Sequence, residues 1–222
     1  MNKILLIIYS TLFLSAAIYA QRTIKVRETK ENIGGGSHTC LSVIIYETTT
    51  DAIEKSWEKF MKSYDAKISS KKEIFADNAL IKEISNNTID VYAKCNPKNE
   101  DEIEFLVAVD LGGAFMNQSD HSTQFKTMEK IVKNFAKQAT IDGIENKINA
   151  QQKVYDKRTK EMEGLIKEKE KLEKDIENYK EKIRKAEEDI KKNLSDQSSK
   201  QKEVDAEKAK LDELTKLKNK VD

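Results

Sequence analysis

The side chains best suited to metal binding or nucleophilic chemistry are two histidines and two cysteines. His38 and Cys40 form a His-x-Cys pair, whereas Cys95 and His121 stand apart in the chain. Zinc sites use these residue types, but their ligands usually come in closely spaced pairs. The four side chains could hold zinc only if the fold brought them together. Because the paired spacing is missing, we expect no metal site and no cofactor.

A second candidate for chemistry is the string from Asp110 to Phe115, followed by Ser119 and His121. It is typical of a strand end, a glycine turn and a helix cap. Alternatively, it could form a small polar pocket in which the glycines let a ligand approach the backbone. Acid–base catalysis needs two carboxylates in one cleft with separated pKa values, and no pattern here places them so. We therefore expect a protein that is not an enzyme and has no catalytic residue.

The amino-acid composition bears on which kinds of partner the protein could bind. The chain has 222 residues with 40 Lys+Arg and 39 Asp+Glu, a net charge of +1. Nucleic-acid binding needs clustered excess basic charge, so we expect no nucleic-acid partner. The chain is 36% charged, with 7 Gly and 1 Pro. This composition is typical of long, solvated helix.

Residues 1–20 have the features of a secretory signal peptide. They carry one basic residue, Lys3, ahead of an apolar run, and small residues at 15–17 offer a cleavage site. An uncleaved anchor is the alternative, but the run is shorter than the roughly 20 residues that span a bilayer comfortably. We expect a periplasmic or secreted protein with no integral membrane span after cleavage.

Export bears on the two cysteines, because an oxidising compartment permits disulfides. Cys40 precedes one predicted strand and Cys95 ends another. If those strand ends lie together, the two residues could form a disulfide. The alternative is two separate buried thiols, which behave as small apolar groups.

Two regions follow the signal peptide and precede the C-terminal third of the chain. Residues 21–39 are polar and end in three glycines and a serine–histidine pair, which predicts a flexible N-terminal segment. Residues 40–139 predict an α/β head domain that begins with a buried strand over 41–47. A helix starting near Asp51 should then bury a stripe at helical spacing. Its members are Ile53, Trp57, Phe60, Met61, Tyr64 and Ile68.

The rest of the head domain predicts four strands and a second helix. The strands should lie near 71–76, 79–85, 88–95 and 102–111, and the helix should open near Ser119. The expected fold class is α+β, a small antiparallel sheet with two helices packed on one face. This order is similar to that of TATA-binding-protein-like and helix-grip folds in topology, and topology does not carry function.

Residues 140–222 predict a coiled-coil stalk. One heptad register runs from Ile141 to Val221, and 16 of its 24 a and d positions are apolar, which is typical of a left-handed coiled coil. In this register Gly143 and Gly164 fall at the outward c position. The predicted interface residues are Ile141, Ile144, Ile148, Tyr155, Met162, Leu165, Leu172, Ile176, Tyr179, Ile183, Ala186, Ile190, Val204, Leu211, Leu214 and Val221.

The partner of this seam has two candidate identities. In a parallel homodimer, oppositely charged g and e′ residues would face each other at Asp175–Lys180 and Lys182–Glu187. Alternatively, the polar stretch Asn193–Lys200 could be a turn that folds the helix back as a hairpin. Because no Gly or Pro interrupts that stretch, the sequence favours a continuous helix.

The string from Asp110 to Phe115, with its following helix running into a Lys/Glu-rich coil, resembles uncharacterised exported bacterial proteins of the same layout. The resemblance implies an architecture and no known activity. We expect a structural or interaction protein of the cell envelope that oligomerises or docks another envelope protein. The alternatives are a ligand-binding module with an apolar cavity under Phe125, Met128 and Phe135, and a periplasmic holdase that grips clients with a helical hairpin.

Overall fold

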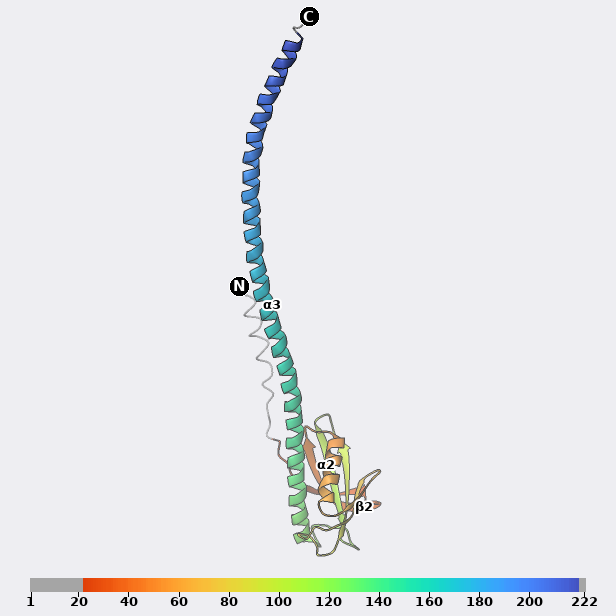
Figure 1. Cartoon of the computed structure of the whole chain (residues 1–222). Helices are drawn as coiled ribbons and strands as arrows, with labels where there is room; N and C mark the ends of the chain where they lie inside the picture. The colour runs from red at the N-terminus through yellow and green to blue at the C-terminus, as the bar shows by residue number, and fades with distance from the viewer. Residues whose placement is uncertain (1–21, 220–222) are drawn as a thin grey trace. The chain divides into compact units, whose positions relative to one another are not determined.

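The computed structural model describes residues 22–219. The expected signal peptide and Val221 lie outside this range. The elements in chain order are β1 (Arg27–Ile33), β2 (Gly36–Tyr46), α2 (Thr50–Lys62), β3 (Lys67–Ser70), β4 (Ile74–Ala79), β5 (Ile89–Pro97), β6 (Glu102–Asp110) and α3 (Ser122–Lys218), as Figure 1 shows.

The strands form one six-stranded antiparallel sheet in the order β1-β2-β6-β5-β4-β3. The expected α+β class is therefore confirmed. The register is continuous across the centre, where Val43 pairs with Phe105 and Cys95 pairs with the same Phe105 on its other side. Alternate residues of each strand consequently share a face.

The main core lies between one face of this sheet and the two helices (Figure 1). Trp57 of α2 is fully buried, with its ring against Phe105 of β6 and Phe135 of α3. Edge-to-face contacts of this kind add to the stabilisation that burial provides. The expectation that both helices pack on one face is correct, and it explains why their apolar stripes face inward.

The flexible segment predicted for residues 21–39 is wrong. Residues 27–33 form β1, and β2 begins at Gly36, so this region is a β-hairpin. The glycines make its turn, because Gly34 and Gly35 have φ values of 66° and 80° that L side chains rarely adopt. The tip is fixed, since the Gly34 N–H donates to the Glu73 carboxylate.

The strand predicted over residues 79–85 is also wrong. The chain leaves β4 at Ala79 and forms a short turn in which the Ile84 N–H donates to the Ile81 carbonyl. Ile81 and Ile84 are both buried from this turn. Ile68, predicted on the first helix, lies on β3 instead, because α2 ends at Lys62.

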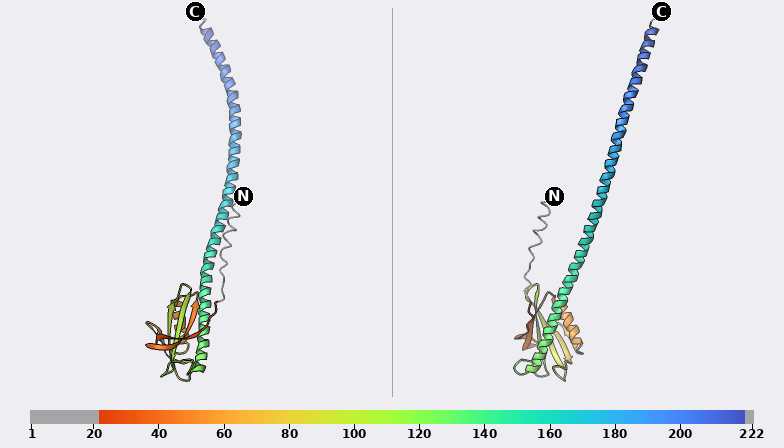
Figure 2. Two further views of the ribbon diagram at one scale, coloured as in Figure 1. Left: turned by 180° about the vertical axis from the view of Figure 1, so that it is seen from behind. Right: turned by 90° about the vertical axis from the view of Figure 1, so that its left-hand side faces the viewer.

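The C-terminal helix α3 is continuous from Ser122 to Lys218, as Figure 2 shows from two sides. Residues 193–200 are helical, so the hairpin alternative is contradicted, and the holdase hypothesis loses the turn that it required. The chain divides into two compact units, with the boundary between Gln152 and Lys153. Of the helices among residues 22–219, none combines the length and apolar character needed to cross a bilayer.

Candidate interaction surface

Every large hydrophobic side chain that is exposed within residues 22–219 lies on α3. There are eighteen, with exposed fractions from 36% to 63%, and we call them the apolar stripe. All eighteen fall at a, d, e or g positions of the heptad. They are Ile141, Ile144, Ile148, Val154, Tyr155, Met162, Leu165, Ile166, Leu172, Ile176, Tyr179, Ile183, Ile190, Leu194, Val204, Leu211, Leu214 and Leu217.

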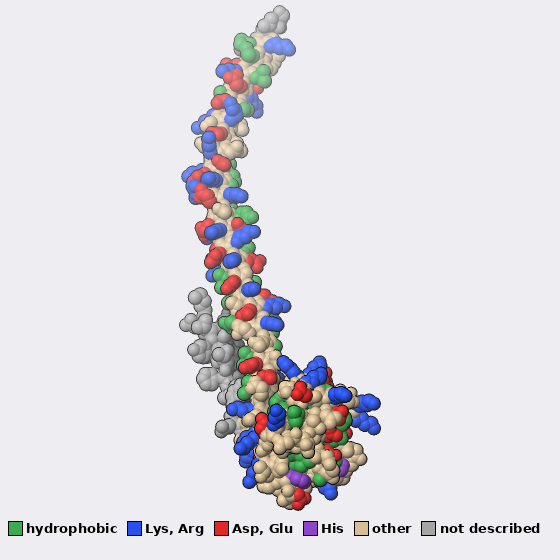
Figure 3. Space-filling view, turned by 60° about the horizontal axis from the view of Figure 1, so that its bottom comes forward, with side chains coloured by type: hydrophobic (Ala, Val, Ile, Leu, Met, Phe, Trp, Pro, Cys, Tyr) green, Lys and Arg blue, Asp and Glu red, His purple; other side chains and the backbone are tan. Residues whose placement is uncertain are grey.

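The predicted interface residues within 22–219 all belong to α3, and their pairing with a partner helix stays a prediction. Each predicted seam residue within 22–219 is exposed, the small Ala186 included. Figure 3 shows hydrophobic side chains recurring between basic and acidic ones along the helix. Val154, Ile166, Leu194 and Leu217 were not predicted, and they widen the stripe because e and g flank the a/d seam.

Ion pairs along α3 occupy the residues beside and between the stripe positions. Arg184 donates to both Glu181 and Glu188, at 2.7 and 2.5 Å, and this contact lowers the pKa of the Glu181 carboxyl. Such pairs at i,i+3 and i,i+4 spacing each stabilise a helix by about 0.2–0.5 kcal/mol. They support the helix, and they leave the apolar stripe without a partner in a single chain.

The N-terminal part of α3 uses a different face to pack on the sheet. Ala136, Ala139, Thr140 and Gly143 are buried there, continuing the stripe of Met128 and Val132. Ile141 and Ile144, interleaved with them, are 36% and 40% exposed. The packed face and the apolar stripe therefore lie on different sides of α3 here, and packing on the sheet continues beyond the predicted domain boundary at residue 139.

Gly143 was predicted to face outward, and the structure corrects this. A Cβ atom at Gly143 would lie 2.4 Å from the Glu47 carbonyl oxygen and 2.9 Å from the Thr48 Cβ atom. Gly164, the other glycine of the same heptad position, has open space around it. The spacing of four residues from Ala139 to Gly143 continues the buried face of the helix and would have predicted burial of Gly143. The heptad register alone predicts the opposite.

Glu47 is the centre of a polar clamp between α3 and the sheet. Its carboxylate pairs with Arg22 and with Lys147, and Lys147 also contacts Asp101 at 3.0 Å. The hydrogen bond from Lys147 lowers the pKa of Asp101. Two turns before Lys147, the Thr140 hydroxyl accepts from the Tyr46 N–H at 3.2 Å. Together these contacts fix residues 140–147 of α3 on the sheet, so the stripe starts at a defined orientation.

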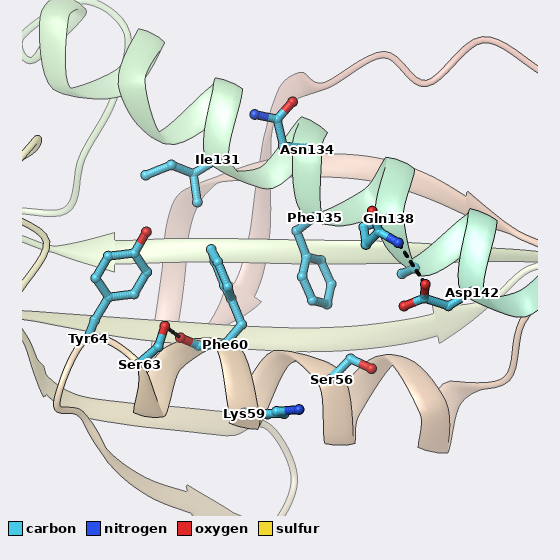
Figure 4. Close-up of a pocket in the computed structure, with 11 residues that line it drawn as sticks. Ser56, Lys59, Phe60, Ser63, Tyr64, Ile131, Asn134, Phe135, Gln138 and Asp142 are labelled. Carbon is cyan, nitrogen blue, oxygen red and sulfur yellow. Dashed lines mark hydrogen bonds between the residues drawn. The ribbon is translucent and has the colours of Figure 1, made fainter.

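A groove of about 720 Å³ lies between α2 and α3, and Figure 4 shows its lining. Phe60, Tyr64 and Phe135 supply its aromatic surface, and Gln138 donates to Asp142 at its rim. The ligand-binding hypothesis expected a cavity under α3 instead. Phe125 and Met128 are packed in the core, and only Phe135 of the three predicted residues borders this groove.

The histidines and cysteines do not form a common site. Cys40 lies on the outer face of the sheet beside Leu106, whereas Cys95 packs against the core on the inner face. Both are free thiols, and burial raises the pKa of each to about 12. The disulfide alternative is thus wrong, because the sheet separates the two side chains. His38 stacks on Phe115 at 3.5 Å between ring centroids.

His121 precedes α3, and its Nδ1 atom is buried without a hydrogen-bond partner. The glycine turn before it has an ordinary structural role, because the Asp110 carboxylate accepts from the Gly112 and Gly113 N–H groups. Within the described part of the chain, no group of three or more His, Cys, Asp or Glu side chains is arranged to hold a metal ion.

Fold and surface together define the class: an α+β domain whose last helix extends into a long amphipathic segment. Comparison with known proteins gives no match to a protein family, to a curated protein or to a solved structure.

Proposed function

We propose that this protein is an exported structural or interaction protein of the cell envelope, which assembles with further copies through the apolar stripe of α3. Export rests on the signal-like residues 1–20. The proposal is supported by the eighteen exposed large hydrophobic side chains among residues 22–219, all of which occupy a, d, e or g positions of one heptad register on α3. Contiguous exposed apolar surface of this kind marks a protein interaction site.

The magnitude of the hydrophobic term favours assembly. Full burial of one Ile, Leu or Val side chain stabilises by about 1.5–3 kcal/mol. Fourteen residues of the stripe lie at a or d positions. Even about 1 kcal/mol at each of them, on each chain, exceeds the roughly 4–15 kcal/mol that association costs in lost freedom. Another envelope protein with a matching helix is the alternative partner.

Charged substitutions in the stripe test the proposal. Ile176→Asp and Ile183→Asp each place a carboxylate at an a position, whereas Asn178→Asp places the same side chain at an exposed c position between them. We expect analytical ultracentrifugation to show smaller species for the first two variants and no change for the third. Equal sedimentation of all three and of the unmodified chain would contradict the proposal.

A further inference from the structure

The first heptads of the apolar stripe are accessible to a second helix while the head domain is in place. The sheet packs against the α3 face that holds Val132, Ala136 and Gly143. Ile141 and Ile144 lie on a different face and remain exposed. At 100° per residue, the centres of these two faces are separated by more than a quarter turn of the helix. Ile141 and Ile144 are therefore accessible to a partner helix, although the flanking g residues Thr140 and Lys147 contact the head domain.

The residue types at a and d indicate how many helices pair and in which direction. Six of the nine apolar a residues are β-branched, five Ile and Val204, and Leu is the commonest apolar residue at d. β-branched residues at a with Leu at d favour parallel, two-stranded coiled coils, since each side chain then packs in a rotamer that suits its layer.

Register distinguishes the parallel arrangement from the antiparallel one. In a parallel, in-register pair each seam residue faces its own copy, so the 16 apolar seam residues meet apolar ones and the other eight meet polar or charged ones. An antiparallel pair that overlaps along the whole seam matches a with d′ residues. That arrangement sets Tyr155 against Glu207, Met162 against Lys200, and Val204 against Arg158. Each such layer buries a charge against an apolar side chain, which is unfavourable.

Four of the five charged residues within the seam, all except Lys218, are compensated on their own helix. Arg158 contacts Glu161 at 2.8 Å, Lys169 contacts Glu173 at 3.3 Å, and Lys200 contacts Glu203 at 2.6 Å. The single acidic seam residue, Glu207, contacts Lys210 at 2.8 Å. All four partners occupy e or g positions at the edge of the stripe. Long side chains held there keep their charge in water while their stems cover the seam.

The flanking charges favour the same arrangement. Parallel pairing brings together Asp175 and Lys180, Lys182 and Glu187, and Glu203 and Lys208, which attract. One pair, Glu168 with Glu173, repels, and Lys169 lies at the a position beside it. In a parallel pair an a residue contacts the preceding g′ residue, so Lys169 also reaches Glu168 of the second copy.

We infer that the occupant of the apolar stripe is the same stripe of a second copy, parallel and in register from Ile141 onward. This inference rests on the proposed function and adds the number, direction and alignment of the chains.

Cysteine cross-linking tests the alignment in the chain lacking residues 1–20, with Cys40 and Cys95 replaced by alanine. Ile148→Cys and Leu214→Cys are the informative variants, since they lie near the two ends of the seam. We expect each to form a disulfide with its own copy under mild oxidation. A mixture of the two, one carrying a mass tag, should give no cross-link between different variants. Ser195→Cys, at an outward f position, is the control and should stay uncross-linked.

The outcomes separate the inference from the proposed function. Cross-links between Ile148→Cys and Leu214→Cys chains, with none between like chains, would show full-length antiparallel pairing and overturn the inference alone. A trimeric mass by light scattering would overturn it as well. A monomeric mass together with no cross-link at any position would overturn the proposed function itself. Cross-linking of Ser195→Cys as fast as the seam variants would overturn the assignment of the interface.

Discussion

Gly143 and Gly164 occupy the same heptad position on the same helix, and we predict that alanine has opposite effects at the two sites. Replacing glycine by alanine inside a helix normally stabilises it by about 0.8–1.0 kcal/mol. At Gly164 nothing lies within 4 Å of the added Cβ atom, so Gly164→Ala should gain that amount. At Gly143 the added atom would lie 2.4 Å from the Glu47 carbonyl oxygen, where ordinary contact begins at 3.4 Å.

The Glu47 backbone cannot easily yield to that atom. Its φ of 58° places it in the left-handed region, its N–H donates to the Asp101 carbonyl at 3.0 Å, and its side chain is held by two ion pairs. Forcing an extra methyl into a well-packed contact costs about 1–3 kcal/mol, and the unyielding Glu47 backbone places this contact in the upper half of that range. After subtracting the gain in helix propensity, we expect Gly143→Ala to destabilise the head domain by about 1–2 kcal/mol.

Urea unfolding measures both effects. Trp57 is the one tryptophan and is fully buried in the head domain, so its fluorescence reports that domain, while circular dichroism at 222 nm reports the helix. Gly143→Ala should lower the fluorescence midpoint, and Gly164→Ala should leave it unchanged while raising helix stability. A fluorescence midpoint for Gly143→Ala equal to or above that of the unmodified chain would refute the close approach of α3 to Glu47.

Three further predictions follow from the same contacts. Lys147→Gln should lower the urea midpoint at pH 7. Because Lys147 holds the pKa of Asp101 low, the difference should be present above about pH 4 and vanish as pH falls through that lowered pKa; equal midpoints at pH 7 would count against it. Burial raises the pKa of the Cys40 and Cys95 thiols to about 12, so iodoacetamide at pH 8 should label the native chain at least about a hundredfold more slowly than the urea-unfolded chain; comparable rates would contradict their burial. Gly34→Ala places a Cβ atom 3.0 Å from an aromatic ring at a φ of +66° and should cost about 1–2 kcal/mol in the urea midpoint; an unchanged midpoint would show that the hairpin tip tolerates a side chain.

Helices and strands whose apolar residues recur at the spacing of one buried face could be predicted from the sequence. Ile103, Phe105, Val107 and Val109 alternate strictly and predict β6 to within one residue of its observed end. Ile53, Trp57 and Met61 likewise predict α2. In both cases the local period and the tertiary packing agree, because one face of the element supplies the core.

Elements that depend on distant partners could not be predicted in this way. β1 is an edge strand of polar residues that buries only Ile33, and hydrogen bonds to β2 rather than an apolar face define it. Residues 79–85 show the opposite error. Ile81 and Ile84 are buried from a turn, so apolar residues there were mistaken for a strand face. Strand propensity reflects context more than local preference, and this explains both outcomes.

The same distinction between local and distant determinants applies to the interaction surface. The heptad predicts every a and d member of the apolar stripe within the described residues, since a coiled-coil seam is a local periodic signal. The clamp of Glu47, Asp101 and Lys147 joins residues that are far apart in the chain, and nothing local marks it. Gly143 belongs to two overlapping periods, one for the sheet and one for the seam, and counting only the second gave the wrong face.

Pairing of the apolar stripe with a second copy fixes the mass that the unmodified chain should have in solution. Light scattering coupled to size exclusion should be run on the chain lacking residues 1–20, over a range of micromolar concentrations. We predict a mass of two chains, falling toward one chain only on dilution. A mass of one chain at every concentration would contradict pairing through the apolar stripe.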